Sequence, residues 1–282
     1  MQDMERHRPG SVSVTAKRRV SYWSWEFRNY YQWFRARMEA ARKTRFVLLC
    51  RGRSGSHLLM SMLEQHPLIH LDHERLVLHQ PKFRVTFLKQ YFEGLSTRGK
   101  TPVYGCKTHV QHVDKQGVDA VKFFHRLHKD GWMLIYLHRR DLLRQGISKA
   151  IARDRNTVFD TEKNPLREYK VRLDPQCLLT LIDNQQKDME RDAAVLSELP
   201  HLRLEYEADL SQPDRQQATL KRIFDYVGVD RVETKSGIQK TTPYDFRDII
   251  LNYDEVMQAV AASKYRYFLT QEELAAEYRR TA

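Results

Sequence analysis

The chain has 282 residues, of which 41% are hydrophobic; this suits one α/β domain with insertions and excludes global disorder. Lys and Arg (48) exceed Asp and Glu (36), and the resulting charge of +12 favours anionic partners such as nucleotides, sulfated substrates, membrane surfaces or nucleic acid, or serves solubility alone. The three cysteines show no metal or CxxC spacing, and we find no signal peptide and no apolar run of about 18 residues, so we expect a cytoplasmic protein without a membrane span.

Residues 1–44 are expected to precede the main domain as a basic arm and an aromatic amphipathic helix over 22–38. Large apolar residues recur in this helix at helical spacing: Trp23, Phe27, Tyr30, Phe34 and Met38. Such a stripe is typical of a helix packed on its own domain or on a second subunit. Aromatic residues beside arginines are also typical of contact with a membrane surface, which would make the protein membrane-associated, and both interpretations stay open.

Residues 45–282 are expected to form a single domain in which strands and helices alternate. The predicted strands cover 45–50, 102–107, 132–138 and 201–206. The predicted helices cover 56–65, 79–94, 115–129, 141–152, 175–198, 213–227 and 254–262. This alternation predicts an α/β fold with a central parallel β-sheet flanked by helices on both faces.

Two of these helices have clear end signals. Asp174 and Pro175 are a typical N-cap and first residue of a helix. Ser211 is expected to open the helix that Gly228 closes. Residues 153–173 lack periodicity and are long for a connection, so this segment is interpreted either as a substrate lid or as a plain surface insertion.

Residues 50–57 read CRGRSGSH and join a predicted buried strand to a predicted helix. Such a junction binds phosphate in many α/β proteins, because the first N–H groups of the helix have no internal partner and the helix dipole is positive there. Gly52 and Gly55 let the backbone wrap around an anion, but they lie too close together for the G-x-x-x-x-G-K-[ST] of a nucleotide triphosphatase, and no lysine follows. The loop is predicted to hold phosphate without the usual magnesium machinery; the alternative is an ordinary Gly/Ser turn.

A second strand-to-helix junction, WMLIYLHRRDLLRQGISKAIAR, carries arginines at the end of its strand. Arg139 and Arg140 end the strand, and Arg144 and Ser148 share a face of the next helix. Arginine with serine suits bidentate binding of a second phosphate, although a charge run is often only a solvated face. The apolar strand that precedes the arginines favours the phosphate interpretation.

Both junctions resemble those of the sulfotransferases that use 3′-phosphoadenosine-5′-phosphosulfate (PAPS). RSGSHLL at 53–59 is similar to the family's 5′-phosphosulfate loop, and EQHP at 64–67 is similar to the end of the helix after it. YLHRRDLLRQGIS at 136–148 is similar to the segment whose Arg and Ser bind the 3′-phosphate. Two later stretches also resemble family segments, so the resemblance covers about 45–260 in patches: LRLEYEADLSQPDRQQATLKRIFDYVGV and KTTPYDFRDIILNYDEV.

The resemblance implies a P-loop-kinase-like sulfotransferase fold, PAPS as the cofactor with PAP as its desulfated product, and no required metal. It implies that Arg53 stands in for the lysine of a P-loop. The choice between Arg139 and Arg140 for the 3′-phosphate stays open. The implied cofactor-binding residues are Arg51, Gly52, Arg53, Ser54, Gly55, Ser56, His57, Leu58, Arg139, Arg140, Ser148 and Lys240.

Transfer of a sulfuryl group needs positive charge on the sulfonate and a base for the proton of the acceptor. The resemblance assigns the first role to Arg53 and Lys107. Two candidates remain for the base: His109 in GCKTH, which matches the cytosolic branch of the family, and Glu74 in IHLDHERL, where other branches place a glutamate. His57, inside the loop, is expected to be a packing or acceptor-side residue.

The leading hypothesis is a PAPS-dependent sulfotransferase that acts on a hydroxyl or amine of a small-molecule, lipid or glycan acceptor. One alternative is a nucleotide-dependent kinase of similar core fold, against which the missing lysine argues. Another is a non-catalytic protein that binds nucleic acid or anionic membranes through the arm and the aromatic helix. Since both predicted phosphate-binding junctions argue against that alternative, nucleic acid is not an expected partner. The oligomeric state stays open, and the helix over 22–38 is where a contact between the two copies of a homodimer would lie.

Overall fold

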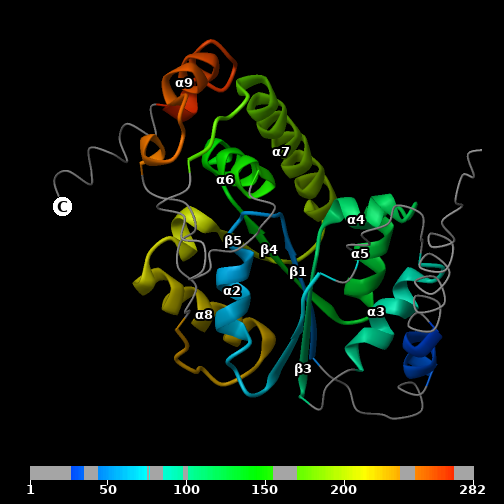
Figure 1. Cartoon of the computed structure of the whole chain (residues 1–282). Coiled ribbons are helices and arrows are strands. Elements are labelled where there is room, and N and C mark those ends of the chain that lie inside the picture. Colours follow the sequence, from blue (N-terminus) through cyan, green and yellow to red (C-terminus); the bar gives the residue numbers. More distant parts are fainter. Residues whose placement is uncertain are drawn as a thin grey trace, which may run out of the picture.

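A five-stranded, all-parallel sheet lies at the centre of the molecule (Figure 1). The computed structural model describes residues 27–34, 44–74, 76, 85–97, 101–154, 170–235 and 245–269. The strands are β1 (Thr44–Cys50), β2 (Ile69–Asp72), β3 (Val103–Thr108), β4 (Trp132–His138) and β5 (Leu202–Glu205), in the order β2-β3-β1-β4-β5. β1 therefore occupies the middle of the sheet, paired with β3 on one side and β4 on the other.

Helices cover both faces of the sheet, and β1 shows why. Its side chains alternate between the two faces: Phe46 and Leu48 pack with α2 (Ser56–Leu63) and α8 (Pro213–Val227), while Val47 and Leu49 pack with α3 (Leu88–Ser96) and α5 (Ala120–Lys129). Because both faces are covered, the strand is a continuous apolar run rather than an alternating one. The predicted α/β fold with a helix-flanked parallel sheet is confirmed.

A third apolar cluster stands at one end of the sheet, where Figure 1 shows three helices gathered. They are α6 (Leu142–Asp154), α7 (Pro175–Leu196) and α9 (Tyr253–Ala261), together with the short 3₁₀ turn Phe246–Asp248. α6 begins directly after β4, so this cluster rises from the carboxyl ends of the strands. Open α/β sheets bind ligands at that end.

Most predicted elements are confirmed, and the exceptions have local causes. β2 was not predicted: it has four residues and contains two polar ones. The helix expected over 115–129 begins later, as α5 at Ala120, because Gly117 adopts a left-handed φ of 74° before it. The short helix α4 (Val110–Lys115), on the other side of Gly117, was not predicted. The Asp174 cap and the Gly228 end are confirmed. The role given to Ser211 is wrong: its hydroxyl donates to Glu207 O in the π-turn Tyr206–Leu210, and Gln212 is the N-cap of α8.

Within the predicted aromatic helix the structure describes a helix over 27–34, which packs on α3 through its polar face. A Cβ on Gly94 would lie 2.0 Å from Asn29 O, so Gly94 permits this close approach. Tyr30 is half-buried and accepts a hydrogen bond from Phe87 N, but Phe27 is 73% and Phe34 59% exposed. These two side chains therefore do not pack on the described part of the domain, and contact with a second subunit or with a membrane surface stays open for them.

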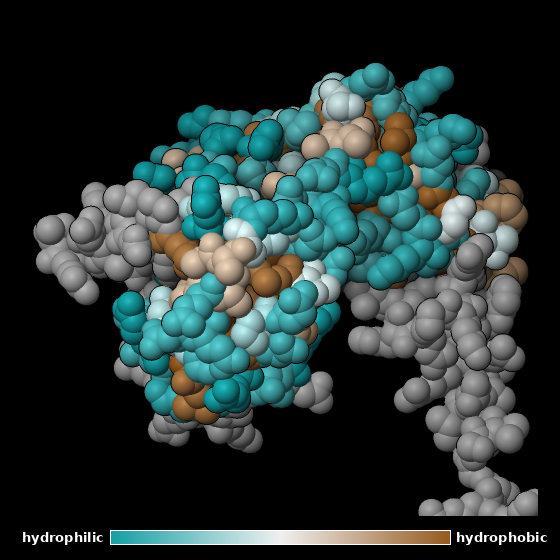
Figure 2. Space-filling view, turned by 90° about the horizontal axis from the view of Figure 1, so that it is seen from above, coloured by the Kyte–Doolittle hydropathy of each residue, from teal (hydrophilic) through white to brown (hydrophobic). Residues whose placement is uncertain are grey.

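Several predictions fall outside the described residues: the basic arm, most of the 153–173 insertion, and Lys240. In the described part, no helix combines the length and apolar character that crossing a membrane requires. Seen from above, the surface is mainly hydrophilic, and the apolar residues visible there form small separate groups (Figure 2).

Candidate functional site

The loop between β1 and α2 is a tight turn at the centre of the sheet. Arg53 and Gly55 adopt left-handed backbone conformations, with φ of 66° and 87°. A Cβ on Gly55 would lie 2.4 Å from the ring of Tyr206, so only glycine fits there. Ser54 is buried, and its hydroxyl donates to Arg51 O, which closes the turn. The N–H groups at the start of α2 are thereby held at the carboxyl end of β1.

Three side chains from the junction between β4 and α6 form hydrogen bonds with this loop. Arg53 Nε donates to Ser148 Oγ at 2.8 Å, and Arg139 Nη1 donates to Arg53 O at 3.2 Å. Gln145, which sequence reasoning did not single out, donates from Nε2 to Gly52 O at 2.9 Å. The structure therefore brings the two segments predicted to bind phosphate into direct contact.

Positive charge is concentrated at this contact. Burial lowers the pKa of Arg53, and the nearby charge of Arg139 lowers it further. Arg139 lies over the ring of Tyr206 at 4.8 Å and 3.5 Å from Glu207. An anion placed between Arg53 and Arg139 would relieve their mutual repulsion.

Two predicted arginines point elsewhere. Arg51 pairs with both oxygens of Asp192 at 2.7 and 2.6 Å and with Asp188 at 2.6 Å, so its guanidinium anchors the loop to α7. The side chain of Arg140 is 63% exposed and 3.6 Å from Glu205. Burial raises the pKa of Asp192 to about 6, although the charge of Arg51 acts to lower it.

The exposed Arg140 side chain points away from the loop, whereas Arg139 donates a hydrogen bond to Arg53 O. Of the two arginines at the end of β4, Arg139 is therefore the one that contacts the loop.

The two candidate bases lie side by side. Glu74 Oε1 is 2.9 Å from His109 Nε2, and Glu74 Oε2 is 3.4 Å from Lys107 Nζ. Glu74 follows β2, while Lys107 and His109 lie at the end of β3, so neighbouring parallel strands deliver all three to one edge. Burial raises the pKa of Glu74, but the hydrogen bond and charge of His109 and the charge of Lys107 outweigh it and bring the pKa to about 2. Glu74 is therefore a carboxylate at neutral pH.

His112 joins this cluster, although sequence reasoning missed it. Its ring stacks on His109 with centroids 4.3 Å apart, and its Nδ1 is 3.2 Å from Glu74 Oε1. Burial lowers the pKa of His109, which the contact with Glu74 partly offsets. Burial and the neighbouring His109 lower the pKa of His112 to about 4. Three-residue spacing puts two histidines on one face of a helix, but no helix was predicted over 109–112, so sequence reasoning did not pair them.

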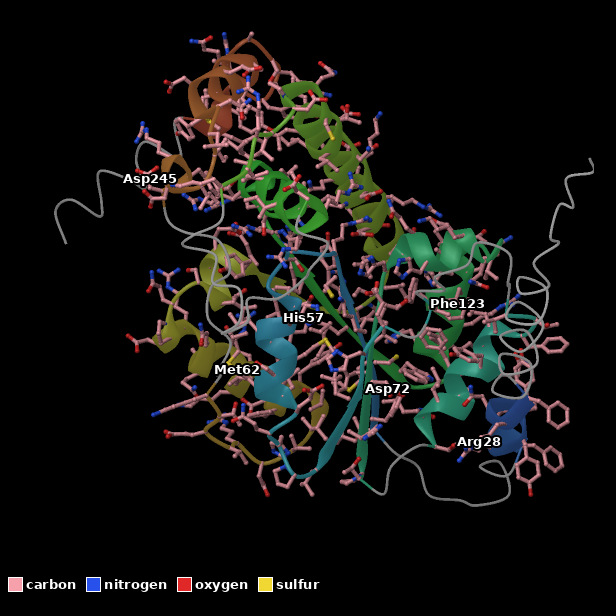
Figure 3. The ribbon with its side chains drawn as sticks, viewed as in Figure 1. Arg28, His57, Met62, Asp72, Phe123 and Asp245 are labelled. Carbon is pink, nitrogen blue, oxygen red and sulfur yellow. The ribbon has the colours of Figure 1, made fainter. Side chains whose placement is uncertain are left out.

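His57 is at the start of α2, at the end of this helix nearest to α6 (Figure 3), and the charges of Lys107 and Glu74 act on it. Its ring stacks on His73 with centroids 6.2 Å apart. Burial, together with the charges of Lys107, His73 and Arg53, lowers its pKa to about 4, so it is neutral at pH 7. Leu58, the next residue, is partly buried and packs against the apolar cluster that includes α2 and α8.

Comparison with known proteins assigns the chain to no family. No protein-family model matches the chain, and no curated protein matches it. What the geometry offers is a cationic, N–H-lined loop next to a carboxylate–histidine pair at the carboxyl edge of the sheet.

Proposed function

We propose that this chain is a PAPS-dependent sulfotransferase that transfers a sulfuryl group to a hydroxyl or amine acceptor. The observation that carries the proposal is the contact between Arg53 Nε and Ser148 Oγ at 2.8 Å. PAPS carries a 5′-phosphosulfate and a 3′-phosphate on one ribose, so its binding site needs two anion sites close together. The contact places the loop at 52–57 next to the Arg139–Ser148 segment, as that requirement demands.

The residues of the two segments fit such an anion. Arg53 and the backbone of 52–57 would hold the phosphosulfate, while Arg139 and Ser148 would hold the 3′-phosphate. The left-handed Gly55 keeps the backbone close to the ligand. Arg51 would contribute only its backbone, because its side chain is engaged with α7. The finer fold assignment, a P-loop-kinase-like sulfotransferase fold, belongs to this same proposal.

Catalysis would use the cluster at the end of β3. The acceptor oxygen would attack sulfur as the bond to the 5′-phosphate breaks, and the acceptor proton would pass to His109 Nδ1, because the Nε2–H of the neutral ring faces the carboxylate of Glu74. Glu74, 2.9 Å away, would orient the ring and stabilise the imidazolium that forms, which gives both candidate bases a role. Lys107 and Arg53 would stabilise negative charge on the transferred group.

A kinase remains the alternative, and one carboxylate bears on it. β2 ends in Asp72, a buried residue whose Oδ2 accepts a hydrogen bond from Tyr104 at 3.0 Å. β2 is separated from β1 by β3, so this carboxylate does not flank the loop as a magnesium ligand would. Asp72 therefore gives no support to a magnesium site at the loop.

We also propose an acceptor and a contact surface for this protein. The acceptor would be a small molecule, lipid or glycan, and the exposed Phe27 and Phe34 are where a membrane surface or a second copy would contact the helix over 27–34. The protein is proposed to act in the cytoplasm and to bind no nucleic acid.

Incubation with radiolabelled PAPS and a panel of acceptor extracts tests the function. We expect the radiolabel to move from PAPS into an acceptor without added metal. We also expect the Arg53→Ala substitution to abolish this transfer. Magnesium-dependent ATP turnover in the absence of any label transfer would instead support the kinase.

A further inference from the structure

Three metal-ligating groups converge at the end of β3. Glu74 Oε1 lies 2.9 Å from His109 Nε2 and 3.2 Å from His112 Nδ1, and all three donor atoms lie within 4.8 Å of one another. His109 and His112 are fixed by the start of α4, while Glu74 comes from the end of β2. All three side chains are largely buried, so little freedom is lost when they bind a common ligand.

These separations are close to those of a zinc site. Zn–N bonds of about 2.0–2.1 Å and Zn–O bonds of about 2.0–2.2 Å put neighbouring donors of a tetrahedral site about 3.4 Å apart. Two imidazoles and one carboxylate are also the ligand set of zinc sites that keep a fourth position open. Binding here needs shifts of a few tenths of an ångström in the two distances from Glu74 Oε1, together with rotation of the stacked histidine rings toward the metal.

We propose that Glu74, His109 and His112 form a binding site for a divalent transition metal of the zinc class, and that the bound metal inhibits the protein. The inhibition rests on the proposed function: a metal on His109 Nε2 replaces the proton shared with Glu74 and lowers the basicity of the ring that would accept the proton of the acceptor. The metal-binding site itself does not depend on that function.

Lys107 tunes the site. Its Nζ lies 3.4 Å from Glu74 Oε2, the oxygen that faces away from the histidines, so the salt bridge and a metal on Oε1 can coexist. The salt bridge orients the carboxylate, as partners beyond the direct ligands often do. The lysine charge also repels a cation, so the affinity is expected to be lower than in a site without it.

Titration of the full, tag-free chain with Co²⁺, followed by visible absorption and then by competition with Zn²⁺, tests the site. One tetrahedral Co²⁺ per chain is expected. His112→Ala should weaken Co²⁺ binding by about 100-fold or more, since loss of even an outer partner costs about 10–100-fold. Lys107→Met should strengthen it. His201→Ala is the matched control: it removes a histidine just before β5, at the opposite edge of the sheet, and should change nothing.

Absence of tetrahedral Co²⁺ in the wild type, or unchanged absorption in a folded His112→Ala variant, would overturn the site. Binding of PAP to the metal-free chain, measured by calorimetry, separates the two proposals. Metal binding without PAP binding would remove the proposed function and keep the site; PAP binding without metal binding would do the reverse.

Discussion

Arg53 Nε donates a hydrogen bond to Ser148 Oγ over 2.8 Å, and this contact joins two strand-to-helix junctions that lie 95 residues apart in the chain. Adjacent parallel strands make the contact possible: β1 and β4 pair in register, so their carboxyl ends and the helices that follow begin side by side. The proposed cofactor site is a consequence of this strand order.

Ser148→Ala should lower the affinity for PAP about tenfold, because a hydrogen bond to a charged group is worth about 1.5–3 kcal/mol and part of that is recovered from water. Arg53→Ala should lower it further, since it removes a cation as well. Calorimetric titration with PAP measures both. Arg140→Ala is the control, because its exposed side chain points away from the loop. If Arg140→Ala weakens PAP binding as much as Arg53→Ala does, the assignment of Arg139 is wrong.

Gly55→Ala should destabilise the loop and abolish PAP binding. The new Cβ would lie 2.4 Å from the Tyr206 ring, and the residue would keep a φ of 87° that alanine disfavours. Gly52→Ala is the matched control in the same loop, because its Cβ would have nothing within 4 Å. Urea denaturation should show a loss of about 1–3 kcal/mol for Gly55→Ala and little change for Gly52→Ala. Equal effects of the two substitutions would contradict the geometry.

His109→Ala should lower the rate of sulfuryl transfer by about 10²–10⁴-fold with PAP binding intact, as expected for loss of a general base. Glu74→Gln should have a smaller effect, because the amide still contacts the ring but no longer stabilises an imidazolium. Steady-state kinetics with a labelled acceptor distinguish the roles. A larger loss for Glu74→Gln than for His109→Ala would make Glu74 the base.

Acidification should destabilise the fold through His112. Its pKa is 6.5 in the unfolded chain but about 4 in the folded one, so the unfolded state binds the proton first and stability falls as the pH drops from 6.5 toward 4. His112→Asn should lose less stability than the wild type between pH 7 and pH 5 in urea denaturation, and His201→Asn serves as a control. Identical losses in the wild type and His112→Asn would show that His112 does not carry this effect.

The sheet and the loop could be predicted because their signals are local. An apolar run followed by Gly, Ser and Arg marks the end of β1, and the periodicity of Leu220, Ile223 and Phe224 marks the buried face of α8. β2 has neither the length nor the apolar character for such a signal.

The side chains of the site were harder to predict because their partners are distant in sequence. Arg51 looks like a phosphate ligand within its loop, but Asp192, 141 residues later, takes its guanidinium. Likewise, His109 and Glu74 were alternatives in the sequence, and only the pairing of β2 with β3 shows that they are neighbours. Local patterns predict where such a site lies, whereas tertiary contacts decide which groups face it.

The most direct test of the central claim is calorimetric binding of PAP and of 5′-AMP to the wild-type chain without magnesium. If the loop and the Arg139–Ser148 segment hold two phosphates of one nucleotide, PAP should bind at least about tenfold more tightly than 5′-AMP, and Ser148→Ala should narrow the difference. Equal affinities for the two nucleotides, or binding that appears only with magnesium, would contradict the account.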